Sequence, residues 1–222
     1  RLKDYRFRHF DWVSRIARKA AAKDPDVFVS TLAYEDTLAW PQGVELAPNV
    51  GVEMCLSVQS WFSPNVYRRQ HGAYRSWIEH EGGRRLLTLW TYALCPWHEV
   101  KYIHGYGAFF PVVYPRHMGR FWEFARDGIR GVFCEITPRY HLLEGYVAMR
   151  LCDDPTLDPD TLVDEHYRLY YGAAGEAMRR FGDELENYSF DIANYSPRVK
   201  AMDPGGSFVY HLHEEKDNWY LG

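Results

Sequence analysis

The chain has 222 residues, of which 46% are hydrophobic and 25% charged, so it can bury a sizeable core and is not intrinsically disordered. A formal net charge of −4 excludes the positive field that binding to nucleic acid or to an anionic membrane requires. Aromatic residues make up 17% of the chain, a surplus that its function has to explain.

Strands and helices alternate over the first part of the chain. Apolar spacing and turn residues predict a helix over 6–23, strands over 27–34 and 49–57, a helix over 66–80, a strand over 85–94, a helix over 115–127 and a strand over 129–136. The inward face of the third helix is predicted to comprise Met118, Phe121, Trp122 and Ala125. Because the strands are almost continuously apolar, they predict a parallel sheet covered by helices, and the class is α/β.

The pattern becomes helical after residue 139. Three helical segments follow, of which the second begins at Asp158-Pro159 and the third spans 172–185. We therefore predict three regions: residues 1–138 with four strand and helix units, 139–187 as a helical tail, and 188–222 as an irregular segment.

Four strand and helix units are half of what a closed (β/α)₈ barrel needs. Half a barrel leaves two sheet edges and a bare inner face, which folded proteins avoid. The sheet is therefore either a small open one or half of a barrel whose other half lies outside this chain. We favour the second arrangement.

The beginning of the chain does not indicate a cellular compartment. The first ten residues, RLKDYRFRHF, lack the apolar core and small-residue cleavage site of a signal peptide, and no run of about 18 apolar residues occurs. The chain starts without Met inside a predicted helix, so we expect a processed or partial polypeptide.

No cofactor is predicted. Phosphate-binding glycine loops and paired metal ligands are absent, and four separated cysteines are interpreted as small core residues: Cys55, Cys95, Cys134 and Cys152.

Two blocks of sequence resemble a known family. The run FVSTLAYEDTLAWPQGVELAP at 28–48 with NVGVEMCLS after it, and the run FWEFARDGIRGVFCE at 121–135 with the YYGAA segment at 170–174, are similar to the glycoside-hydrolase-like domain of unknown function DUF4838. The resemblance implies a (β/α)₈ barrel related to hexosaminidase and α-glucuronidase barrels, some members being endo-β-N-acetylglucosaminidases. It also implies a register, in which these four strands are the fifth to eighth and form the C-terminal half of the barrel. The general acid would then follow the fourth strand, before Arg1, and the resemblance suggests secretion to a periplasm or cell surface.

In a parallel barrel, substrate meets the C-terminal ends of the strands and the loops after them. Sugars offer flat C–H faces and hydroxyl groups, which aromatic rings and acidic or amide groups complement. The predicted substrate-binding residues at these ends are Tyr34, Asp36, Trp61, Trp90, Trp97, His98, Glu99 and Tyr106.

Two residues are predicted to serve catalysis. Glu135 ends an apolar strand and would clamp substrate hydroxyls or act as an acid or base, the alternative being an ion pair with Arg139 or Arg116. The Tyr92 hydroxyl would hold the oxygen of a substrate acetamide, the alternative being a core tyrosine. If the strand register differs by one strand, Glu35 and Asp36 become the catalytic pair.

Together with these residues, the resemblance implies a retaining glycoside hydrolase that cleaves a β-linked N-acetylhexosamine with help from the substrate acetamide. A non-catalytic carbohydrate-binding or scaffolding barrel, an α-glucuronidase-like hydrolase and a stand-alone α/β domain are the alternatives. The expected partners are a glycan and the missing half of the barrel, supplied by the same polypeptide or by another chain; neither nucleic acid nor a membrane is expected.

Overall fold

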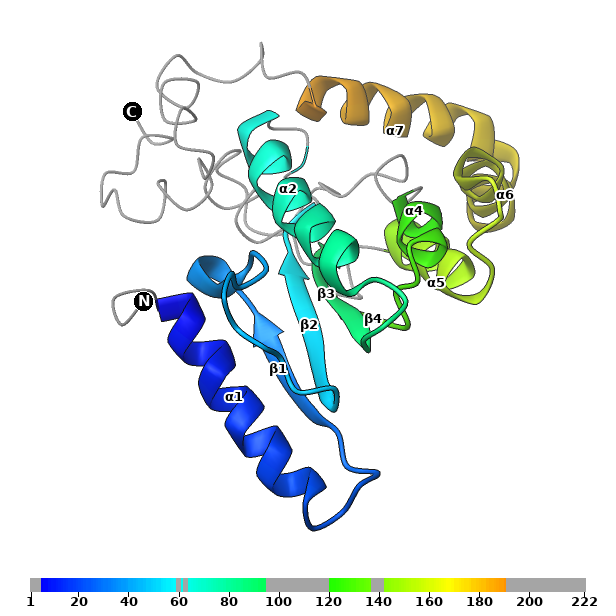
Figure 1. The fold of residues 1–222 in the computed structure, drawn as a ribbon. Coiled ribbons are helices and arrows are strands. Elements are labelled where there is room, and N and C mark those ends of the chain that lie inside the picture. The colour runs from blue at the N-terminus through cyan, green and yellow to red at the C-terminus, as the bar shows by residue number, and fades with distance from the viewer. Residues whose placement is uncertain (1–4, 59–60, 62–63, 95–119, 137–141, 191–222) are drawn as a thin grey trace. The chain divides into compact units, whose positions relative to one another are not determined.

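The computed structural model describes residues 5–58, 61, 64–94, 120–136 and 142–190 (Figure 1). The chain divides into two compact units. The first comprises Arg1–Leu56, Gln70–Thr91 and Phe124–Phe133, and the second comprises Ser57–Arg69, Tyr92–Glu123 and Cys134–Gly222.

A four-stranded parallel sheet begins in the first unit, and its last two strands end in residues of the second. Its order is β1-β2-β3-β4, where β1 is Val29–Ala33, β2 Val50–Leu56, β3 Leu87–Leu94 and β4 Val132–Ile136. The pairs β1–β2 and β2–β3 are parallel, and backbone hydrogen bonds from Arg130 to Leu87 and from Leu89 to Gly131, both 3.0 Å, join β3 to the start of β4. The prediction of an α/β chain with a parallel sheet is confirmed.

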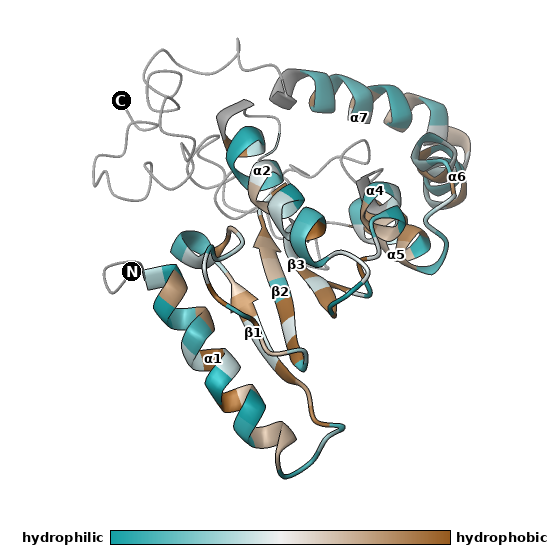
Figure 2. Ribbon diagram, viewed as in Figure 1, coloured by the Kyte–Doolittle hydropathy of each residue, from teal (hydrophilic) through white to brown (hydrophobic). Residues whose placement is uncertain are grey.

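One face of this sheet is aliphatic and covered by helices. Residues of β2 and β3 on this face are fully buried: Val50, Val52, Met54, Leu56, Leu87 and Leu89. They lie beneath α1, Tyr5–Ala21, and α2, Pro64–Glu81, whose Phe10 and Trp77 rings meet edge to face at 5.3 Å. Figure 2 shows the hydrophobic residues along β1 and β2 next to the more hydrophilic α1.

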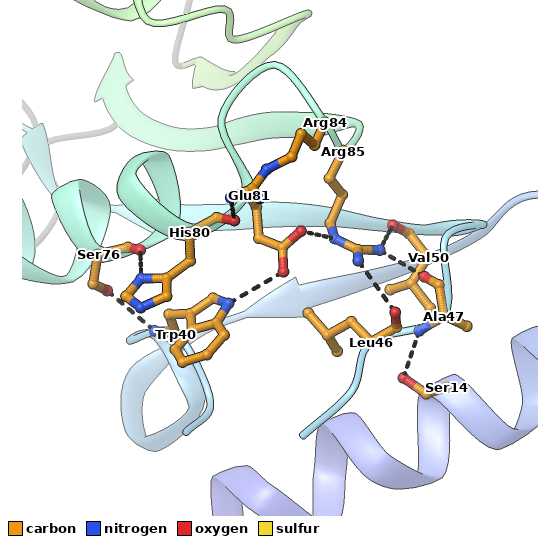
Figure 3. Close-up of polar contacts among 10 residues, drawn as sticks. All are labelled: Ser14, Trp40, Leu46, Ala47, Val50, Ser76, His80, Glu81, Arg84 and Arg85. Atoms are coloured by element: carbon orange, nitrogen blue, oxygen red, sulfur yellow. Dashed lines mark hydrogen bonds and ion pairs between the residues drawn. The ribbon is translucent and has the colours of Figure 1, made fainter. Parts of the chain in front are cut away.

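Arg85 fixes the loop at the N-terminal ends of β2 and β3 (Figure 3). Its guanidinium donates to the carbonyl oxygens of Ala47 at 2.7 Å and Val50 at 2.8 Å, and to a carboxylate oxygen of Glu81 at 2.9 Å. The second oxygen of Glu81 accepts from the indole N–H of Trp40 at 3.3 Å, so one buried ion pair ties α2 to the β1–β2 loop. This end of the sheet is thus closed by structural contacts.

The predicted inward face of the third helix is wrong where the structure describes it. Helix α4 spans Arg120–Arg126, and its buried residue is Phe124, which meets Tyr74 edge to face at 5.3 Å. Trp122 and Ala125 are exposed instead. A helix of seven residues turns too few times for apolar spacing to fix its orientation.

Three helices make up the described C-terminal part of the second unit: α5 Leu142–Asp153, α6 Pro159–Tyr171 and α7 Gly175–Phe190. The predicted start of α6 is confirmed, because Asp158 caps it by accepting from the Thr161 amide at 2.9 Å. Residues Gly172–Ala174 form a separate 3₁₀ turn, and α7 begins at Gly175, since Gly172 has a φ of +53° that no regular helix contains.

Among the three described cysteines, the predicted core position is confirmed for Cys55. Cys55 is buried in β2, Cys134 is half-buried in β4 and Cys152 is exposed on α5, and none of the three forms a disulfide. Cys95 lies outside the described residues.

Candidate functional site

The second face of the sheet differs in chemistry from the face beneath the helices. Side chains alternate along a strand, so the residues between the buried aliphatic ones lie on this face. In the first unit they are Ser30, Leu32, Glu53, Cys55, Thr88, Trp90 and Phe133. Except for the buried Cys55, these side chains are half-buried or exposed. We call this surface the open face.

Register places a carboxylate beside an aromatic surface on the open face. Glu53 lies between Leu32 of β1 and Thr88 of β3, and the next residue on its side, Cys55, is opposite Trp90. The Trp90 and Phe133 rings are in contact, with centroids 4.2 Å apart. The two ring planes are inclined by 44°. Aromatic and polar groups therefore adjoin on this face, an arrangement suited to a ligand with both apolar and hydroxyl groups.

The predicted catalytic residues follow along the same two strands. Tyr92 is two residues beyond Trp90 in β3, and Glu135 is two residues beyond Phe133 in β4. Because side chains alternate along a strand, Tyr92 lies on the same side of β3 as Trp90, and Glu135 on the same side of β4 as Phe133. Both residues are half-buried. They belong to the second compact unit, so the structure fixes their strand positions but not their distances to residues of the first.

The end of β1 carries the next group of predicted residues. Tyr34, Glu35 and Asp36 enter a 3₁₀ turn in which the Thr37 hydroxyl donates to the Tyr34 carbonyl at 2.8 Å. Glu35 adopts a φ of +48°, which is rare for a residue with a side chain. The guanidinium of Arg6 donates to the backbone oxygen of Asp36 at 3.0 Å, so the carboxylates of this acidic pair stay exposed at the surface.

Of the remaining predicted residues, the structure describes Trp61. The side chain of Trp61 is buried, with an exposed fraction of 3%, and its ring meets Tyr67 edge to face at 5.5 Å. Four further predicted residues lie outside the described residues: Trp97, His98, Glu99 and Tyr106. Their contact with substrate stays a prediction.

Glu53 is the residue that sequence reasoning missed. The signal was present, because Glu53 is the single charged residue of β2 and interrupts an otherwise apolar strand. Its strand was interpreted as one of the almost continuously apolar strands of a sheet covered by helices. Among the described residues, helices cover the side of β2 that carries Val52 and Met54, and Glu53 is on the other side.

Metal and membrane sites were searched within the described residues. They contain no group of three histidine, cysteine or acidic residues that could hold a metal ion. Among the helices that the structure describes, none has the length and apolar character needed to cross a bilayer.

Comparison with known proteins gives one finding. Neither the curated proteins nor the solved structures contain a match to this chain. The family model described as "Domain of unknown function (DUF4838)" matches residues 4–183, which are most of the chain. The protein is therefore a member of the DUF4838 family.

Proposed function

We propose that this protein is a glycoside hydrolase, and that its sheet is the C-terminal half of a (β/α)₈ barrel that binds a glycan at the ends of its strands. The observation that carries the proposal is the contrast between the two faces of the sheet. One face is mainly aliphatic, with Thr31 and Thr91 among its residues, whereas the open face combines Glu53 with the adjoining rings of Trp90 and Phe133. Aromatic rings beside carboxylates complement the flat C–H faces and hydroxyl groups of sugars.

The edge of the sheet supports completion of the barrel by further strands. Among the described strands, β1 has a neighbour on one side only. On α1, Tyr5, Trp12 and Ile16 share a helix face that is exposed, with 63% of Trp12 accessible, while Phe10 and Val13 are buried on another. An open strand edge beside an exposed apolar helix face suits an added strand and helix unit.

The proposed chemistry is cleavage with retention of configuration, assisted by the substrate acetamide. The acetamide oxygen bonds to the anomeric carbon while the glycosidic bond breaks, and a general acid protonates the departing oxygen. Water then opens the cyclic intermediate. In this scheme the Tyr92 hydroxyl donates a hydrogen bond to the acetamide oxygen, Glu135 holds substrate hydroxyls, and the general acid comes from the strands outside this chain.

The test uses the complete polypeptide and a panel of chromogenic α- and β-glycosides. We expect turnover of an N-acetyl-β-hexosaminide and none of the matching glycoside with a 2-hydroxyl group. Glu135→Gln should lower kcat/KM at least tenfold, because an amide holds sugar hydroxyls less strongly than a carboxylate. Tyr92→Phe should lower kcat more than it changes KM, because without this hydrogen bond the acetamide is less well oriented for attack on the anomeric carbon.

Glu79→Gln, an exposed position on α2, is the matched control and should leave turnover unchanged. Binding of glycans without turnover by the wild type would make the protein a carbohydrate-binding barrel, and turnover of α-glucuronides would assign the other hydrolase class. Unchanged turnover and affinity in Glu135→Gln would eliminate the role of that residue.

A further inference from the structure

Glu53 stands at the middle of the sheet, where a charge is least expected. It is the fourth of seven residues in β2, with strands on both sides, and pairs with Leu32 and Thr88. Neither neighbour carries a charge. A central strand position is normally occupied by an apolar or β-branched side chain, so the presence of a carboxylate there needs a physical explanation.

The fold of the first unit does not use this charge. Other half-buried or buried charges in the unit form ion pairs: Arg85 with Glu81 at 2.9 Å and Arg75 with Asp127 at 2.6 Å. For Glu53, no hydrogen bond or ion pair is present within the described part of the chain. Its side chain is half-buried, and when further strands cover the open face its carboxylate requires hydrogen-bond donors.

The surroundings of Glu53 indicate what kind of ligand could supply those donors. On the side toward the strand starts, Gly51 leaves room that the Leu86 side chain fills, at 3.3 Å from where a Cβ would stand. On the side toward the strand ends lie Cys55 and the Trp90 ring. The carboxylate thus stands between an apolar floor and an aromatic ring, one strand layer below the ends where substrate is bound in barrels.

We propose that Glu53 is a substrate-contacting residue, whose carboxylate accepts hydrogen bonds from hydroxyl groups of the sugar ring that lies against Trp90. The inference rests on the proposed function and adds to it the innermost contact of the site. A carboxylate can accept from two neighbouring hydroxyls at once, which selects a sugar by the orientation of that pair. Glu53 therefore determines which sugar is accepted.

The experiment compares wild type, Glu53→Gln and Glu45→Gln in the complete polypeptide. Glu45 is an exposed glutamate of the β1–β2 loop, so its variant is the matched control. We measure kcat/KM on the glycoside that the wild type cleaves best, and on versions of it that lack one ring hydroxyl each. We record the melting temperature of every variant.

We expect Glu53→Gln to lower kcat/KM at least tenfold with an unchanged melting temperature, and Glu45→Gln to behave as wild type. In the wild type, removal of one particular ring hydroxyl from the substrate should lower kcat/KM by a similar factor. In Glu53→Gln, removal of the same hydroxyl should lower kcat/KM little further, because the hydroxyl and the carboxylate are partners. If Glu53→Gln does not fold, Glu53→Asp replaces it and should also lose activity, since its carboxylate is withdrawn by one methylene.

Three results overturn the inference. Wild-type turnover by Glu53→Gln would remove Glu53 from the site. A lowered melting temperature with intact turnover would make it a structural residue that pairs within the completed barrel. Absence of both glycan binding and turnover in the wild type would reject the proposed function itself, and the Glu53 assignment with it, before any variant is compared.

Discussion

At the scale of single residues, the helical unit buries two acidic side chains. Glu144 of α5 has an exposed fraction of 1% and Glu186 of α7 one of 5%. The pKa of Glu144 is raised from 4.5 to about 8, chiefly by burial. A hydrogen bond from its own backbone lowers the pKa, and the charge of Glu186 adds to the rise. Glu144 is therefore protonated in the folded protein at neutral pH.

This shift predicts that stability falls as pH rises. Between the unfolded pKa of 4.5 and the folded value of about 8, the folded state holds a proton that the unfolded state has released, so the free energy of unfolding decreases. The slope is roughly 1 kcal/mol per pH unit over that window. Glu144→Gln should remove this slope and raise the melting temperature at pH 8 above that of wild type.

Denaturation by urea at pH 5, 6.5 and 8 measures the effect. Glu184→Gln replaces an exposed glutamate of α7 and should keep the slope of the wild type. Equal slopes for Glu144→Gln and the wild type would show that Glu144 ionises without cost in the folded protein.

At the scale of elements, the contacts of Arg85 decide how the β1–β2 loop returns to the sheet. Its side chain is 6% exposed. Its N–H groups donate to the backbone carbonyl oxygens of Ala47 and Val50 at the start of β2 and to the Glu81 carboxylate of α2. Buried carbonyl oxygens without donors are costly, so this residue links α2, the loop and β3 into one unit.

Arg85→Met is expected to lower the free energy of unfolding by about 3 kcal/mol, because it leaves the Glu81 charge buried without its cation. Thermal and urea unfolding, followed by circular dichroism, give the difference. The neighbouring Arg84 is exposed and bonds only the His80 carbonyl among the described contacts, so Arg84→Met should stay within about 0.5 kcal/mol of wild type. Equal losses in the two variants would contradict the structural role of Arg85.

At the scale of the whole molecule, the outer edge of β1 bears on the proposed barrel, because no further strand pairs with it among the described residues. The Val29 amide donates to Asn49 at 2.9 Å. Because donors alternate sides along a parallel strand, the amides of Ser30 and Leu32 point away from β2. In a completed barrel these two amides pair with a further strand.

Hydrogen exchange tests this closure. In the chain of 222 residues, the Ser30 and Leu32 amides should exchange much faster than those of β2. In a longer polypeptide that supplies the remaining strands, they should be protected to the level of β2. The β2 amides are paired in both samples and serve as the internal control. Equal, fast exchange in both would contradict a closed barrel.

Much of the fold followed from local sequence. The described helices and strands lie close to their predicted ranges, because apolar spacing, the Asp158 cap and the Gly83 turn act over a few residues. Errors arose where packing decides. In α4, Phe124 instead of Trp122 faces inward.

The candidate site divides in the same way. Trp90 and Tyr92 could be predicted, because strand ends and aromatic residues are visible in the sequence. The location of Glu53 could not, since it depends on which side of β2 the helices cover. The burial of Trp61 and of Glu144 likewise depends on neighbours that are distant in sequence.

The sequence by itself determined the elements, the α/β class and the family to which the chain belongs, because periodicity, capping and family motifs are properties of neighbouring residues. Only the tertiary structure decided the strand order, the register that sets Glu53 between Leu32 and Thr88, and the face of the sheet that stays open. Those choices belong to contacts between segments tens of residues apart, and a shift of one residue in register would turn every side chain of a strand to the opposite face.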